Sequence, residues 1–123
     1  MQTRAFQNLI VWQRSRALAI DVCRAASGKA FSGDWGLRDQ LRKSAVSVPS
    51  NIAEGNERGS DRDTTRFFFI ARGSLAELAT QADIACELGL LGPDQAKSWI
   101  TECDELARML AALIARRKSF PER

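Results

Sequence analysis

The run LRDQLRKSAVSVPSNIAEGN, residues 37–56, has the pattern of an amphipathic helix although a proline lies near its middle. Apolar side chains recur every three or four residues on both sides of that proline, at Leu37, Leu41, Ala45, Val48 and Ile52. A proline inside a helix removes one backbone hydrogen bond and crowds the carbonyl four residues back, here that of Ala45. Because the apolar pattern continues unchanged, we expect one helix over about residues 34–57, bent near Pro49.

Further helical patterns flank this segment, and we expect helices at about residues 8–27, 61–88 and 93–118. Short glycine-containing runs separate the helical segments, as is usual for helix-to-helix connections. Ser60 and Asp63 resemble a capping box, and Pro93 suits the first position of the last helix. The sequence therefore predicts an all-α fold, an antiparallel up-down-up-down four-helix bundle that forms a single domain over residues 1–123.

Composition restricts the classes of function. The 123 residues are 45% hydrophobic, which is enough for one core. No apolar run approaches the ~18 residues of a membrane span, and the N-terminal residues lack a signal-peptide pattern, so we expect a cytoplasmic protein without membrane contact. The absence of histidine removes the commonest general base and metal ligand, so an enzyme is disfavoured and no cofactor or metal is expected. Three widely spaced cysteines lie in apolar helical patterns and are expected to act as small core hydrophobes: Cys23, Cys86 and Cys103.

A polar stripe runs beside the apolar stripe of the segment 34–57, and similar polar positions interrupt the next segment. One interpretation is a half-buried hydrogen-bonded network that fixes helix register, with arginines compensating carboxylates. Its members would be Gln40, Arg42, Ser47, Asn51, Glu54, Arg72, Ser74 and Glu77. The alternative uses Glu54 and Glu77 as a catalytic or metal-binding carboxylate pair, but di-iron bundles also need histidine, so the network is favoured. Gly55 and Gly73 would let the two helices approach closely.

Three consecutive rings, Phe67, Phe68 and Phe69, project around more than half the circumference of the third helix. One bundle core cannot bury side chains in all three directions. We therefore expect this helix to contact another subunit as well, with these phenylalanines as the candidate oligomer interface.

Positive charge gathers at the two ends of the chain, although the net charge is only +3. Residues 1–43 carry 8 basic and 3 acidic side chains, residues 44–105 carry 5 and 11, and residues 106–123 carry 5 and 1. If the ends meet in space, they form a basic face that attracts nucleic acid or another polyanion. The candidate phosphate contacts are Arg14, Arg16, Arg24, Lys43, Arg116, Arg117 and Lys118. The alternative is that these charges only solvate helix faces.

Four motifs in order carry a family resemblance: VWQ at 11–13, GL-x-x-QLR at 36–42, S-x-P-x-NIAEG at 47–55 and A-x-GSL-x-EL at 71–78. The chain resembles, over about residues 6–116, the four-helix-bundle proteins encoded by intervening sequences of bacterial 23S rRNA genes. The resemblance implies a homo-oligomer, commonly a pentameric ring, of unsettled biochemical role. A similar fold occurs in accessory proteins of diversity-generating retroelements, which look like basic barrels that bind nucleic acid and a reverse transcriptase. Lys43 stands where the family usually has arginine, so a role that needs a bidentate guanidinium there is in doubt.

Two binding functions and one catalytic function follow from these features. The first is a non-enzymatic homo-oligomer, pentameric by the resemblance, that contacts RNA or DNA phosphates without reading sequence. The second is a scaffold or adaptor that binds another protein, which the acidic middle of the chain favours because carboxylates weaken a phosphate-binding surface. The third, a magnesium-dependent nuclease or phosphotransfer factor, is disfavoured because the chain has no phosphate-binding loop or metal motif.

Overall fold

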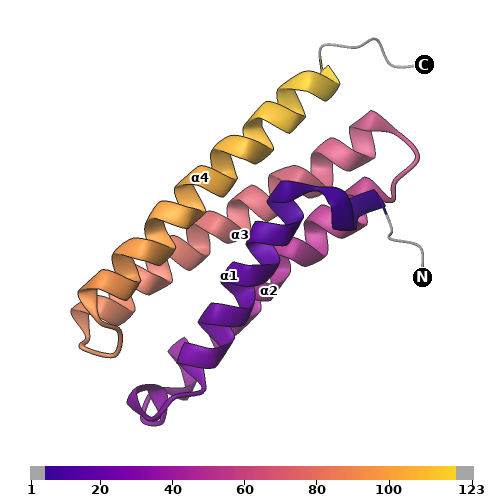
Figure 1. Ribbon diagram of the computed structural model, residues 1–123. Helices are drawn as coiled ribbons and strands as arrows, with labels where there is room; N and C mark the ends of the chain where they lie inside the picture. The colour runs from indigo at the N-terminus through magenta and orange to yellow at the C-terminus, as the bar shows by residue number, and fades with distance from the viewer. Residues whose placement is uncertain (1–4, 119–123) are drawn as a thin grey trace.

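Four long helices make up almost the whole molecule (Figure 1). The computed structural model describes residues 5–118, and no strand occurs within them. The elements in chain order are the 3₁₀ helix η1 (Ala5–Asn8), α1 (Ile10–Ala26), the 3₁₀ helix η2 (Lys29–Phe31), α2 (Trp35–Asn56), α3 (Asp61–Glu87) and α4 (Pro93–Lys118). The predicted all-α four-helix bundle is confirmed. The observed first helix, α1, is shorter than the expected range of residues 8–27. It begins at Ile10, because residue 8 belongs to η1.

Capping side chains explain where α2 and α3 begin, and a glycine explains where α3 ends. Asp34 Oδ1 accepts a hydrogen bond from the backbone N–H of Leu37 at 3.2 Å and caps α2. Ser60 Oγ likewise accepts from the N–H of Asp63 at 3.2 Å, at the position of the predicted capping box. After α3 the chain adopts a positive φ of 77° at Gly89, a conformation that glycine allows without strain.

The helix α2 continues through Pro49, so the segment is one helix and not two. Two polar side chains that directly follow the proline donate to carbonyls of the preceding turn. Ser50 Oγ donates to the Val46 carbonyl and Asn51 Nδ2 to the Ser47 carbonyl, each at 2.8 Å. A bend at Pro49 stays a prediction.

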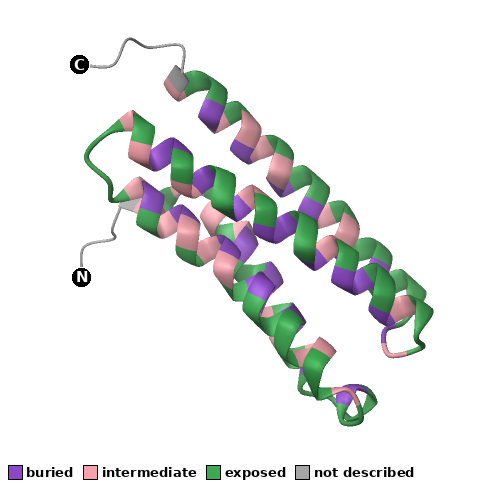
Figure 2. Cartoon of the chain, turned by 180° about the vertical axis from the view of Figure 1, so that it is seen from behind, coloured by how far each residue is buried: buried purple, intermediate pink, exposed green. Residues whose placement is uncertain are grey.

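The core lies along the inner faces of the helices, and Figure 2 shows buried and exposed positions alternating along each of them. The largest fully buried side chains are Trp99, Phe31, Phe68, Leu41, Ile52, Leu75, Leu78, Leu106 and Leu110. Consecutive helices pack extensively on each other, whereas α1 and α4 touch much less. Among the described residues, no helix is long and apolar enough to cross a membrane.

The cysteines differ in their surroundings. Cys103 is buried in the core, while Cys23 and Cys86 are half-buried, and all three are free thiols. Burial, with a smaller contribution from the charge of Glu102, raises the pKa of the Cys103 thiol to about 12. Cys103 is therefore a neutral core side chain near pH 7, as expected from its apolar helical setting.

Candidate nucleic-acid interface

A groove of about 580 Å³ lies between α1 and α2. Two of its lining residues, Arg16 and Arg24, are exposed arginines. The remaining residues that line it are apolar or small: Ala19, Ile20, Cys23, Ser27, Val46 and Pro49. No carboxylate lines this groove within residues 5–118. The groove thus combines an apolar surface with positive charge.

Helical spacing explains how α1 forms its side of the groove. Arg16, Ile20 and Arg24 follow each other at intervals of four residues and therefore lie on one side of the helix. The two arginine Cα atoms are separated along the axis by about 12 Å, from eight residues at 1.5 Å each. Two positive charges with no carboxylate between them in the groove attract polyanions.

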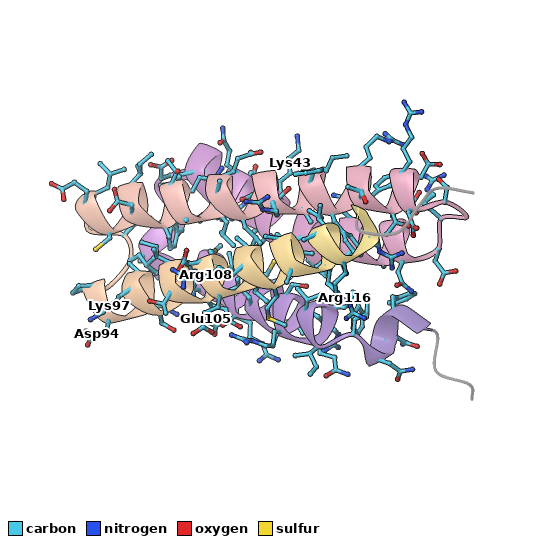
Figure 3. All side chains as sticks on the ribbon, turned by 90° about the horizontal axis from the view of Figure 1, so that it is seen from above. Lys43, Asp94, Lys97, Glu105, Arg108 and Arg116 are labelled. Atoms are coloured by element: carbon cyan, nitrogen blue, oxygen red, sulfur yellow. The ribbon has the colours of Figure 1, made fainter. Side chains whose placement is uncertain are left out.

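Two further cations lie on the exposed surface of α2. Arg42 precedes Val46 by one helical turn and so shares a face with this groove residue. Arg42 is exposed, so it does not lie in the half-buried polar network that the sequence predicts for it. Lys43 is exposed as well, and in Figure 3 it lies well away from Arg116.

Arg14 is half-buried, and carboxylates of α4 hold its guanidinium. Its Nε lies 3.0 Å from Glu102 Oε2, and its Nη2 contacts both Glu102 and Glu105. The hydrogen bonds that the guanidinium donates to Glu102 and, to a smaller extent, to Glu105 raise its pKa above the ordinary value. Arg14 therefore joins α1 to α4, and its charge is already compensated.

The cations near the end of α4 have separate surroundings. Arg117 pairs with Asp61 at 3.0 Å and lies 5.7 Å from the centroid of the Phe68 ring. Arg116 is exposed and lies near the C-terminal end of α4 in Figure 3. The side chain of Lys118 lies outside the described residues. The six predicted phosphate contacts whose side chains the structure describes are thus spread over the bundle, and two of them, Arg16 and Arg24, share the α1–α2 groove.

A polar network does connect α2 and α3, but its membership differs from the predicted one. Ser47 Oγ and Ser74 Oγ are 2.8 Å apart, and Asn51 Nδ2 donates to Ser47 Oγ at 2.9 Å. A second group centres on Gln81, which is buried and accepts from Ser44 Oγ at 2.5 Å. Gln81 Nε2 in turn lies 3.4 Å from Gln40 Oε1.

Ser44 and Gln81 are members of this network that were not predicted from the sequence. Their helical spacing could have indicated them, because Ser44 precedes Ser47 by three residues and Gln81 follows Ser74 by seven. Both residues therefore lie on the same helix faces as the serine pair.

The charged members of the predicted network do not join it. Glu54 pairs at 2.6 Å with Arg58, which lies just beyond the end of α2, and Glu77 is exposed. Arg72 lies 5.9 Å from the centroid of the Phe69 ring, and its buried Nε has no hydrogen-bond partner among the described residues. Asn51 also hydrogen-bonds within its own helix and not to α3. Exposed carboxylates can be solvated, so they need no partner across the helix interface.

The three phenylalanines point in different directions. Phe68 is in the core at 1% exposure, while the half-buried Phe67 lies between Arg58 and Arg66, whose guanidinium carbons are 4.6 and 4.7 Å from its ring centroid. Phe69 is 45% exposed and lines a shallow groove of about 800 Å³ with the exposed Ile70. Phe69 is therefore the member of the triplet that offers a large apolar surface outside the core.

A comparison with solved structures agrees with the observed fold, whereas no curated protein matches the chain. A crystal structure titled as a protein with unknown function from the S23 ribosomal protein family of Bacteroides thetaiotaomicron VPI-5482 is similar, with a TM-score of 0.78 and 18% sequence identity. The similarity covers 85% of this chain and 98% of that chain. At this identity the likeness shows the fold alone.

A family model described as "23S rRNA-intervening sequence protein" matches residues 7–112. This match confirms the resemblance that the four sequence motifs carry. The chain belongs to the 23S rRNA-intervening sequence protein family.

Proposed function

We propose that this protein is a non-enzymatic, self-assembling helical bundle that binds the phosphates of RNA or DNA through the groove between α1 and α2. The observation that carries the proposal is the pairing of Arg16 and Arg24 in a groove that no carboxylate lines within the described residues. Arg42 and Lys43 add exposed positive charge on α2. Such a surface favours a polyanion whatever its sequence, and the cytoplasm supplies nucleic acid as that polyanion.

Assembly would strengthen a surface that is weak in one protomer. The exposed apolar side chains of α3, among them Phe69 and Ile70, support a contact between copies. The family resemblance suggests a ring of five. In such a ring the same groove is repeated in every protomer, and several modest sites act together on one long strand.

The test is the salt dependence of nucleic-acid binding. We expect the logarithm of the association constant to fall linearly with the logarithm of salt concentration, because phosphate contacts release counterions. The double variant Arg16→Ala/Arg24→Ala should bind more weakly and have a slope smaller by roughly 1.5, from two lost phosphate contacts. Fluorescence anisotropy with a labelled RNA over a salt series measures both quantities.

Arg108→Ala is the matched control for this experiment. Arg108 is an exposed arginine of α4 that pairs with Asp104 at 3.1 Å, away from the α1–α2 groove. Its loss should leave the slope unchanged. Binding that does not respond to salt, or equal losses in the groove variant and the control, would contradict the proposal.

A scaffold that binds another protein is the second candidate function. The exposure of Phe69 and Ile70 favours it, because apolar surface of this kind also suits a different protein. Affinity capture from a native lysate, with and without nuclease, separates the candidates. A protein partner that survives nuclease treatment, together with no binding of purified RNA, would favour the scaffold.

A further inference from the structure

Trp35 is the most exposed large apolar side chain among the described residues, at 64%. It is the first residue of α2, and the neighbouring Asp34 caps this helix, so its backbone is held in place. The guanidinium carbon of Arg38 lies 4.4 Å from the centroid of the indole ring. An arginine stacked on an indole in this way limits the orientations of the ring and brings positive charge to it.

Helix register connects this tryptophan to the groove between α1 and α2. Trp35, Arg42, Val46 and Pro49 are separated by seven, four and three residues, so they share one face of α2. Val46 and Pro49 line the groove. Trp35 precedes Val46 by eleven residues, so the two lie about 16 Å apart along the helix axis, at 1.5 Å per residue.

The chain order places Trp35 beyond one particular end of the groove. Arg24 and Ser27 line the groove near the end of α1, and a short connection then leads to the start of α2. Because α1 and α2 are antiparallel neighbours, the start of α2 lies near the end of α1. The exposed indole of Trp35 therefore lies beyond the end of the groove, past its arginines and apolar side chains.

We propose that the nucleic acid bound in this groove is single-stranded and that one of its bases stacks on Trp35; this inference rests on the function proposed above. Single strands present the flat faces of their bases, which stack on aromatic side chains whatever the sequence. The arginines bind phosphates, and the apolar residues of the groove accept the faces of unstacked bases. In a duplex those faces are hidden, so Trp35 and the apolar residues would add little to its binding.

The experiment compares a short single-stranded oligonucleotide with the duplex that it forms with its complement. We expect tighter binding of the single strand, accompanied by quenching of tryptophan fluorescence. Trp35→Ala should weaken single-strand binding by roughly 5- to 150-fold, the range for loss of one stacked base, and leave duplex binding unchanged. Trp35→Phe, which keeps a ring, should retain most of the single-strand affinity.

Trp12→Phe is the matched control, since Trp12 is half-buried and packs edge-on against Phe6 with ring centroids 5.2 Å apart. This variant should retain the quenching, whereas Trp35→Phe should lose it. The wild-type quenching also tests the inference if Trp35→Ala does not fold, which its melting curve would reveal.

Different outcomes overturn different statements. Duplex binding as tight as single-strand binding, with no effect of Trp35→Ala, would overturn the inference and leave the proposed function standing. A lower assembly mass in Trp35→Ala would mean that the indole of Trp35 contacts another copy of the chain. This result also overturns the inference. If the wild-type protein binds neither nucleic acid but does bind an acidic peptide, the inference and the proposed function both fail.

Discussion

At the scale of single residues, Gly55 shows how closely α2 and α3 approach. A Cβ added there would lie 2.9 Å from Cβ of Phe67 and 3.2 Å from Cδ1 of Phe68. The Gly55 carbonyl also accepts a hydrogen bond from Thr64 Oγ1 at 2.7 Å, which anchors the start of α3 on the end of α2. Because a Cβ cannot rotate away, a larger residue at 55 must push the helices apart.

We therefore predict that Gly55→Ala destabilises the protein by about 1–3 kcal/mol, despite the higher helix propensity of alanine. Gly73→Ala is the matched control, because a Cβ at this helical position would have no atom within 4 Å apart from its chain neighbours and the nearby backbone of its own helix. It should stabilise the protein by about 0.5–1 kcal/mol. Urea unfolding of both variants gives the two free energies, and equal effects would show that the contact at Gly55 is unimportant.

The two glycines also show what sequence alone could predict. Both lie in amphipathic helices, and the sequence predicts that both allow close approach of α2 and α3. Only Gly55 does so, because close approach depends on how each helix is rotated against its neighbour. The periodicity of apolar residues defines that rotation too coarsely to separate a buried position from a neighbouring exposed one.

At the scale of elements, the contact between α1 and α4 differs from the other helix pairs. These two helices touch sparsely, and polar side chains line a groove of about 720 Å³ between them. The Nε1–H of Trp99 donates to Asp21 Oδ2 at 2.7 Å, and Arg14 pairs with Glu102 and Glu105. Hydrogen bonds and ion pairs therefore contribute a larger share of this contact than of the others.

We predict that Asp21→Ala destabilises the protein by about 1–3 kcal/mol, because it leaves the N–H of the buried Trp99 unpaired. Asp39→Ala is the control, since this exposed aspartate only pairs with Arg38 at 3.5 Å and should change stability by less than about 0.5 kcal/mol. Thermal unfolding measures both. A loss in Asp21→Ala no larger than in the control would mean that water satisfies the indole.

The helices themselves could be predicted from the sequence, whereas the contact between α1 and α4 could not. A helix depends on local spacing and capping, and the predicted bounds of α2, α3 and α4 fall within a residue or so of the observed ones. The pairing of Arg14 with Glu102 joins residues far apart in the sequence. Nothing in the local pattern around Arg14 distinguishes it from Arg16, which is why both were candidates for phosphate contacts.

At the scale of the whole molecule, the basic side chains that the structure describes do not gather on one face. The basic N-terminal segment contributes the groove arginines, while Arg14 and Arg117 are compensated by carboxylates of α4 and α3. The charge of a segment is a property of its sequence, but a binding surface depends on which charges remain unpaired after packing. We therefore expect the proposed nucleic-acid binding to depend on repetition of the groove, and so on the proposed assembly.

Assembly through α3 is the last prediction, and it concerns the exposed part of the phenylalanine triplet. We expect light scattering to give a mass several times the 13.6 kDa of one chain, near five times if the ring suggested by the family forms. Phe69→Ser/Ile70→Ser should lower that mass, because both residues are large, apolar and more than 40% exposed in the single chain. Since neither side chain belongs to the core, the variant should keep its helical circular dichroism.

Ile10→Ser is the control for this variant, because Ile10 is also an exposed apolar residue but lies at the start of α1. It should leave the mass unchanged. Salt-dependent RNA binding should weaken together with the mass in the Phe69/Ile70 variant, since a single groove loses the benefit of repetition. A wild-type mass of one chain would refute assembly, and unchanged RNA binding in a dissociated variant would show that one groove is sufficient.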